Sequence, residues 1–276
     1  MSKLRSALEA LLSACVFLAS VGIYDLLKVT DEELGVANTM WDLFSVVGLG
    51  LAIIFFLLDF QKTLIFAGSN FQLINMITPF IKFAGTAFIL SKGKEIVGMI
   101  LGMGNKIIDS IEYSELDLEN KEFTNMFDDA NIFVLVLALI LCLVMLLVSL
   151  IIGALMMFKC IAYKIELIIR VGLTPLSLGD LGDGWQSKAF KWLKGIFGHM
   201  LYGACFILVI QIGTQLQPAI STSIMGAYNG LGDIVSNEII KTLLFAIIGL
   251  LSAILVPIAE LGVLGACKQL TQEVMQ

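Results

Sequence analysis

Charged residues are scarce in this chain. Only 14% of its 276 residues are Asp, Glu, Lys or Arg, whereas 58% are hydrophobic. Soluble domains carry about 25% charged residues, so this composition excludes an ordinary soluble domain and favours a protein embedded in lipid. The net charge of −6 is spread along the chain, which argues against direct nucleic-acid binding. The length fits a single polytopic membrane domain.

Residues that commonly carry catalysis are also few. His199 is the only histidine, and no carboxylates or thiols gather near it in the sequence to complete a metal site. The five cysteines show no C-x-x-C spacing, so we expect no disulfide framework. A phosphate-binding G-x-x-x-x-G-K-[ST] loop is absent. The sequence therefore predicts no enzyme, no cofactor and no metal.

Long apolar runs dominate instead. A membrane-spanning helix needs about 20 mainly apolar residues, and this requirement predicts spans near 41–60, 71–90, 130–158, 195–217 and 242–266. Residues 1–30 form a separate segment with an interfacial or marginally spanning helix, and residues 31–276 form the polytopic domain. The predicted fold class is an all-α integral membrane protein with about five transmembrane helices plus the N-terminal helix.

Basic residues in the connecting segments predict the orientation. Residues 159–194 hold six Lys or Arg and three acids, whereas 91–129 hold four lysines and nine acids. We therefore expect 159–194 and the C-terminus on the inside, and 91–129, 218–240 and the segment before Trp41 on the outside. Apolar spacing over 98–112 predicts a further helix on the outer face, whose G-x-x-x-G pattern at 98–102 would allow close helix packing.

Two ionisable residues lie inside predicted spans and are functional candidates for that reason. A lysine at the bilayer centre costs about 3 kcal/mol, so Lys82 should either extend to the interface or meet a buried polar partner. Glu260 lies near the inner end of the last span. It either reaches the interface or pairs with a basic residue, for which Lys159, Lys164 and Arg170 are candidates.

The richest polar chemistry lies in 168–194. We expect Arg170 near the end of the third spanning helix, Thr174 and Pro175 to stop that helix, and a second helix to begin in "WQSKAFKWLKG". The candidate site residues of this segment are Arg170, Pro175, Lys188, Lys191, Trp192 and Lys194. A lipid anchor is one interpretation, because lysines and aromatic side chains suit the headgroup zone. A docking surface is the other, with Glu166 or Glu260 as an internal partner for Arg170.

Arg170, then Pro175, a glycine-rich gap, and "KWLK" at 191–194 opening another span resemble the central signature of TrbL-type membrane proteins. These proteins are polytopic inner-membrane subunits of type IV secretion and conjugation systems. The resemblance rests on about 155–217 and elsewhere on topology alone. It implies a channel or scaffold subunit in the bacterial cytoplasmic membrane that helps move a DNA–protein substrate. It also implies a homo-oligomer whose partners are other secretion subunits, including cytoplasmic ATPases, together with membrane lipids.

Two other classes of function remain open. Lys82 and Glu260 within spans would also suit a solute or ion transporter. A membrane partner protein that transports nothing is the third class.

Overall fold

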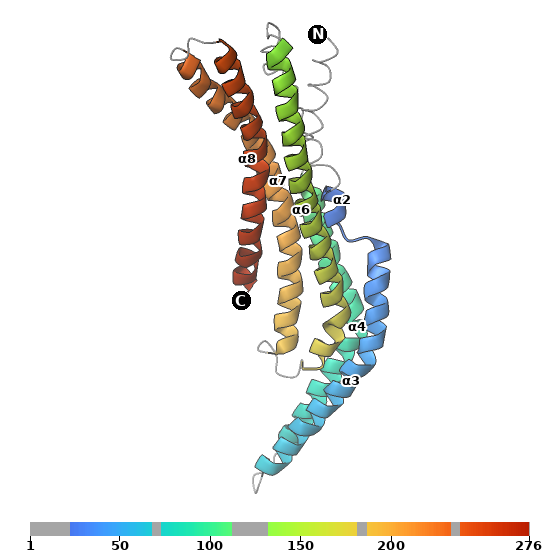
Figure 1. Ribbon diagram of the computed structural model, residues 1–276. Coiled ribbons are helices and arrows are strands. Elements are labelled where there is room, and N and C mark those ends of the chain that lie inside the picture. Colours follow the sequence, from blue (N-terminus) through green and yellow to red (C-terminus); the bar gives the residue numbers. More distant parts are fainter. Residues whose placement is uncertain (1–22, 68–72, 112–131, 181–186, 233–237, 276) are drawn as a thin grey trace. The chain divides into compact units, whose positions relative to one another are not determined.

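The computed structural model describes residues 23–67, 73–111, 132–180, 187–232 and 238–275, and every regular element in these ranges is an α-helix. The elements are α2 (Ile23–Leu27), α3 (Asp31–Ala67), α4 (Leu73–Ser110), α6 (Ile132–Leu178), α7 (Lys188–Gly232) and α8 (Glu238–Met275) (Figure 1). The predicted all-α class is confirmed for these residues. Most of the predicted N-terminal helix, residues 1–22, lies outside them.

Four described helices contain segments long and apolar enough to cross a membrane. The segments are Asp31–Ile65, Leu139–Leu178, Lys188–Leu216 and Ile254–Thr271. Each overlaps a predicted span, and together they indicate an integral membrane protein. The remaining predicted span, 71–90, corresponds to the first half of α4, which is not among the four. The total of about five spans stays a prediction.

The helices are longer than a single membrane crossing requires. α3 and α4 have 37 and 38 residues, or about 55 Å at 1.5 Å per residue, against about 30 Å of hydrocarbon in a bilayer. The separate surface helix predicted over 98–112 is wrong, because α4 continues without a break to Ser110. Lys92 and Glu95, which form an ion pair three positions apart at 2.6 Å, support helix in the intervening segment.

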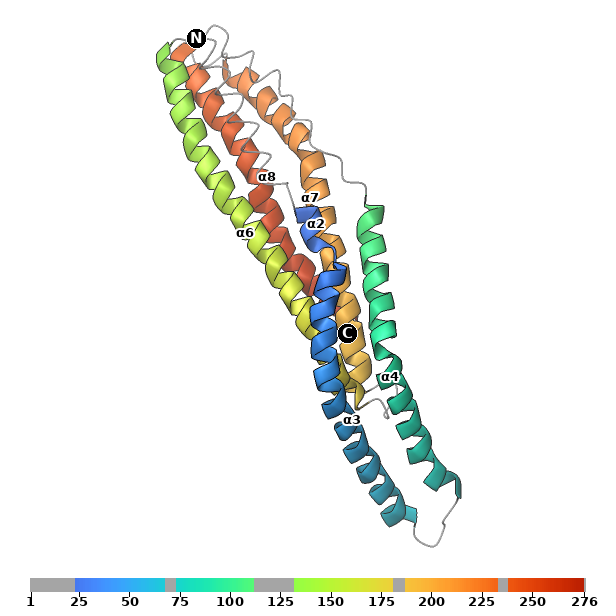
Figure 2. The ribbon, with the colours of Figure 1, turned by 90° about the vertical axis from the view of Figure 1, so that its right-hand side faces the viewer.

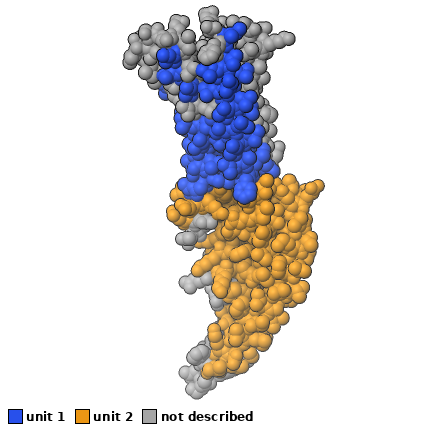
Figure 3. Space-filling model, viewed as in Figure 1, with its two compact units in different colours: residues 1–26, 111–160, 205–267 blue, residues 27–110, 161–204, 268–276 orange. Residues whose placement is uncertain are grey.

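The chain forms two compact units, coloured separately in Figure 3. Unit 1 contains residues 1–26, 111–160 and 205–267, and unit 2 contains 27–110, 161–204 and 268–276. The divisions fall inside α6, α7 and α8, so these three helices contribute to both units. The buried core of unit 1 includes Met156, Phe206, Ile207 and Leu264; that of unit 2 includes Trp41, Leu101, Leu167 and Met200.

In unit 2, α3 and α4 lie side by side as an antiparallel hairpin (Figures 1 and 2). A capping box begins α3: the Thr30 N–H donates to Glu33 Oε2 at 3.0 Å, and the Glu33 N–H donates to Thr30 Oγ1 at 3.4 Å. The helices approach closely at Gly93, where an added methyl group would lie 2.6 Å from the Trp41 ring. The lack of a side chain at Gly93 therefore leaves room for the buried Trp41 indole.

The last part of α6 runs alongside the first half of α3. Gly172 lies against the Met40 side chain, Gly48 lies against the backbone of Pro175, and Gly179 lies against Leu51. Residue numbers rise together in the two helices, so the segments run parallel. Pro175 consequently lies beside the middle of the predicted 41–60 span.

Ion pairs of unit 2 occur on both sides of the apolar residues 43–58 of α3. Lys94–Asp42, Lys164–Glu33 and Lys28–Asp109, each at 2.6 Å, lie toward the N-terminal end of α3. They are spread along the hairpin, because Lys94 and Asp109 are about 22 Å apart along α4. Lys82–Asp59, at 3.0 Å, lies at the other end of the apolar stretch.

The Lys164–Glu33 pair corrects the predicted orientation. Simple alternation put Glu33 outside and Lys164 inside, but groups 2.6 Å apart cannot lie on opposite sides of a membrane. The predicted orientation rested on the number of basic residues in 159–194, taken as one loop. In the structure, residues 161–178 are part of a helix that packs along α3. The basic residues of 159–194 therefore do not all belong to one end of the hairpin.

Candidate functional site

Glu166 is the centre of a charged cluster in unit 2. Its Oε1 accepts from Arg170 Nη2 at 2.8 Å and from Nε at 3.3 Å, and its Oε2 accepts from Lys268 Nζ at 2.9 Å. Arg170 and Glu166 are four residues apart on α6, so one helical turn brings them together. Of the two partners expected for Arg170, Glu166 is the one observed. Arg170 is thus engaged within the chain.

Trp192 connects the first turn of α7 to α6. Its indole N–H lies 3.2 Å from both the Arg170 carbonyl oxygen and Thr174 Oγ1. The Thr174 hydroxyl in turn donates to the Arg170 carbonyl at 2.8 Å. The Trp192 indole therefore joins α7 to α6 at the Arg170 carbonyl and the Thr174 hydroxyl, while the Arg170 side chain binds Glu166 within α6.

Pro175 does not stop α6, which corrects the sequence-based expectation. The helix continues through Pro175 to Leu178, although proline cannot donate to the Val171 carbonyl. Side-chain hydrogen bonds reinforce the turns on both sides: Thr174 Oγ1 donates to the Arg170 carbonyl, and Ser177 Oγ donates to the Thr174 carbonyl at 2.8 Å. Packing against Gly48 also favours the helical path.

The lysines of the predicted docking segment differ in their surroundings. Lys188 and Lys191 are exposed, and neither side chain forms an ion pair with an acid in the described part of the chain. Lys194 lies over the Phe190 ring, with Nζ 5.7 Å from the ring centroid, close enough for a cation–π contact. The Ser187 hydroxyl caps this helix by accepting from the Phe190 N–H at 3.2 Å. The first turn of α7 therefore presents two exposed positive charges that pair with no acid in the described ranges.

His199 is buried against α6 and has a structural environment. Its Nε2 lies 3.0 Å from the Tyr163 carbonyl oxygen, and its ring stacks on the Tyr163 ring at 4.7 Å between centroids. Its Nδ1 is 3.9 Å from Glu166 Oε1. Within the described ranges, no group of three or more His, Cys, Asp or Glu residues is arranged to hold a metal ion.

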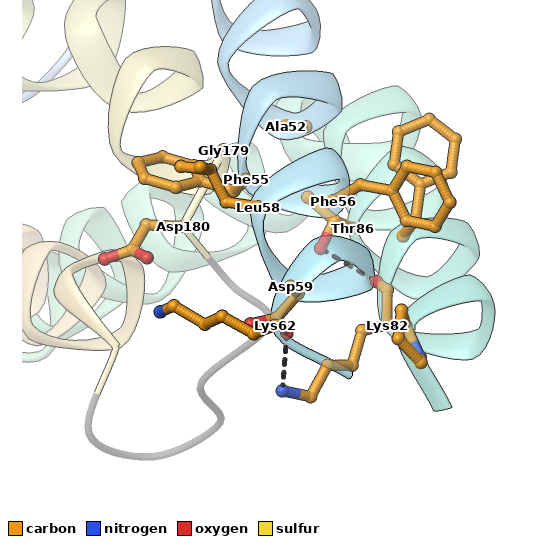
Figure 4. Close-up of a pocket in the computed structure, with 12 residues that line it drawn as sticks. Ala52, Phe55, Phe56, Leu58, Asp59, Lys62, Lys82, Thr86, Gly179 and Asp180 are labelled. Atoms are coloured by element: carbon orange, nitrogen blue, oxygen red, sulfur yellow. Dashed lines mark hydrogen bonds and ion pairs between the residues drawn. The ribbon is translucent and has the colours of Figure 1, made fainter. Parts of the chain in front are cut away.

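Lys82 pairs with an acidic side chain of the α3–α4 hairpin. Its Nζ binds Asp59 Oδ2 at 3.0 Å, joining α4 to α3. This pair forms part of the wall of a pocket of about 250 Å³ in unit 2 (Figure 4). Four charged groups line the pocket: Asp59 and Lys62 from α3, Lys82 from α4, and Asp180 just after α6.

Sequence reasoning selected only Lys82 among these pocket residues. The available signal was the position of Asp59 and Lys62, directly after the apolar run of α3. Asp180 gave no comparable signal, because its approach to α3 depends on the parallel packing of α6.

Glu260 belongs to unit 1, where α8 meets α7. It is 9% exposed, and its carboxylate lies directly against Gly213. The three expected cation partners are engaged elsewhere: Lys159 donates to the Leu261 carbonyl at 2.8 Å, while Lys164 binds Glu33 and Arg170 binds Glu166. Within the described residues Glu260 is therefore a buried acid without a cation.

Comparison with protein-family models, characterised proteins and solved structures finds no match to this chain. Inferences about its function thus rest on its own residues and their geometry.

Proposed function

We propose that this chain is a TrbL-type channel or scaffold subunit of a conjugative type IV secretion system in the bacterial cytoplasmic membrane. In this role it crosses the membrane about five times and helps a DNA–protein substrate to pass. Separate ATPases supply the energy, because the sequence has no nucleotide-binding loop of its own. The observation that carries the proposal is the joining of Arg170, Thr174 and Trp192 by hydrogen bonds, since the resemblance rests on this stretch.

The residues of the candidate site differ in whether their side chains are available to a partner protein. Arg170 is a positioning residue, because Glu166 and Trp192 occupy its side chain and carbonyl. Lys188 and Lys191 are exposed and pair with no acid among the described residues, so they are the groups suited to an acidic partner surface. We assign docking of a cytoplasmic ATPase to these two lysines, with Lys62 and Asp180 on the same side of the membrane.

Reversing the two docking charges tests the proposal. The double variant Lys188→Glu/Lys191→Glu should reduce DNA transfer in mating assays by about tenfold or more, as expected if opposed charges replace attractive ones. ATPase recovered with the tagged protein should fall in parallel, at unchanged membrane abundance. Lys92→Glu is the matched control, because Lys92 is exposed on α4 and pairs, among the described residues, with its neighbour Glu95 alone. Wild-type transfer by the double variant would refute the docking role, and wild-type transfer without the chain would refute the secretion role.

A solute or ion transporter is the second candidate, favoured by one observation. Glu260 is a buried acid against Gly213 with no cation partner in the part of the chain that the structure describes, and such acids within membranes often mark transport pathways. Glu260→Gln distinguishes the candidates. A transporter should lose uptake of its solute in this variant, whereas a secretion subunit should retain DNA transfer.

A further inference from the structure

The pocket of unit 2 lies where the apolar surface of α3 ends. Residues 43–58 contain no charged residue, and Leu57 and Leu58 remain about half exposed. Asp59 and Lys62 follow at once, inside a segment long and apolar enough to cross a membrane. If α3 crosses a bilayer, this change from apolar to charged marks the boundary between hydrocarbon and headgroups.

The charges of the pocket are balanced but only partly paired. Lys82 and Asp59 neutralise each other at 3.0 Å. Lys62 is exposed and forms no ion pair within the described residues. Asp180 accepts the Lys188 backbone N–H at 3.4 Å and forms no ion pair with a lysine or arginine in the part of the chain that the structure describes. Figure 4 shows the Lys62 side chain extending toward the side on which Asp180 lies. The pocket therefore offers one open positive and one open negative charge.

The apolar part of the pocket suits a hydrocarbon chain. Phe55, Phe56, Phe83, Leu58, Pro79 and Ala52 line it. Phe56 also packs against Phe80 and Phe83, with ring centroids 5.0 and 5.1 Å apart. These ring contacts fix the aromatic side of the pocket. The exposed side chains of Phe55 and Leu58 extend the apolar surface away from the charged end.

We propose that this pocket binds the headgroup of a zwitterionic, amine-bearing phospholipid such as phosphatidylethanolamine. The lipid phosphate meets Lys62, its ammonium group meets Asp180, and its acyl chains follow the apolar side of α3. A purely anionic headgroup fits less well, because Asp180 would repel it. A volume of about 250 Å³ accommodates a headgroup but not a whole lipid, whose chains must lie outside. The assignment does not depend on the secretion role, and either can fail alone.

Binding of fluorescent lipids to the full-length protein in mild detergent tests this assignment. The probes are phosphatidylethanolamine and phosphatidylglycerol with identical labelled acyl chains, followed by fluorescence anisotropy. The wild type should bind phosphatidylethanolamine at least about threefold more tightly, as one partly screened charge contact allows. Asp180→Asn should abolish this preference, whereas Lys62→Gln should weaken binding of both lipids. Lys92→Gln, an exposed lysine of α4 outside the pocket, should bind like the wild type.

Three outcomes would overturn the proposal. Equal binding of the two lipids by the wild type would show that the ammonium group is not recognised. A preference that survives Asp180→Asn, or wild-type affinity for both lipids in Lys62→Gln, would place the lipid site elsewhere. Displacement of the lipid by an equal concentration of water-soluble phosphoethanolamine would assign the pocket to a soluble zwitterion, because the acyl chains would then contribute nothing.

Discussion

Lys164 of α6 donates to Glu33 of α3 across 2.6 Å, although 131 positions separate the two residues in the chain. Both side chains are largely buried. The contact fixes the start of α3 beside the middle of α6 and places both residues on one side of any membrane that α3 crosses.

Cross-linking should detect this proximity in membranes. In a background without native cysteines, Glu33→Cys/Lys164→Cys should be joined by a short bifunctional thiol reagent. Lys62→Cys/Lys164→Cys should not react, because Lys62 lies 29 positions further along α3, or about 43 Å of helix. Gel mobility after proteolysis between the two positions reports the link. A link in the control pair alone would contradict the parallel packing of α3 and α6.

Two glycines of α4 should respond oppositely to alanine. A methyl group at position 93 would lie 2.6 Å from the Trp41 ring, whereas one at position 85 would meet nothing within 4 Å. We expect Gly93→Ala to destabilise the protein by about 1–3 kcal/mol, as overpacking does. Gly85→Ala should be neutral or stabilising by up to about 1 kcal/mol, since alanine favours helix. Thermal unfolding in mild detergent compares them, and equal midpoints would refute the close α3–α4 contact.

Removing the indole N–H should loosen α7 from α6. Trp192→Phe keeps an aromatic ring but loses the donor to the Arg170 carbonyl and Thr174. We expect a loss of about 1 kcal/mol. Thr174→Val removes the hydroxyl that shares this arrangement, so the double variant should cost less than the sum of the two single variants. Strict additivity in unfolding measurements would show that the two groups act independently.

Exchanging the charges of the α3–α4 ion pair should preserve the fold. Lys82→Asp alone would place a second acid beside Asp59, and Asp59→Lys alone would pair two lysines. Each single variant should lower stability, and Lys82→Asp/Asp59→Lys should recover part of the loss. Both side chains are more than a third exposed, so we expect a coupling of no more than about 1 kcal/mol. Unfolding of the four proteins gives this value, and a double variant worse than either single one would rule out direct pairing.

Composition and local spacing predict part of this molecule. The uncharged run at 130–158 allows little except a helix in lipid, and Glu166 and Arg170 are four residues apart, so their pairing follows from helix geometry. The G-x-x-x-G pattern at 98–102 makes no close contact among the described residues of this chain, because added methyl groups at Gly98 and Gly102 would meet nothing within 4 Å. Close contacts are made by other glycines, such as Gly48 and Gly93, whose neighbours are distant in sequence.

The candidate site was less predictable, because its contacts also join residues that are distant in sequence. Arg170, Pro175 and Trp192 stand out in the sequence, but the role of each depends on what packs against it. Pro175 of α6 packs against Gly48 of another helix, and Asp180 lines the pocket only because it approaches α3. Such contacts depend on tertiary packing, which short-range spacing does not encode.

The position of Lys268 in the chain has a consequence for biosynthesis. Glu166 precedes Lys268 by 102 residues, so a ribosome adding about 5–20 residues per second makes the carboxylate roughly 5–20 s before the lysine. Of the two basic residues that form ion pairs with Glu166, Arg170 and Lys268, only Arg170 has been synthesised during that interval. Nascent chains halted before residue 268 should therefore be cut more readily by membrane proteases than chains released after it. The Glu166–Lys268 ion pair would therefore distinguish chains in which residue 268 has been synthesised from shorter nascent chains.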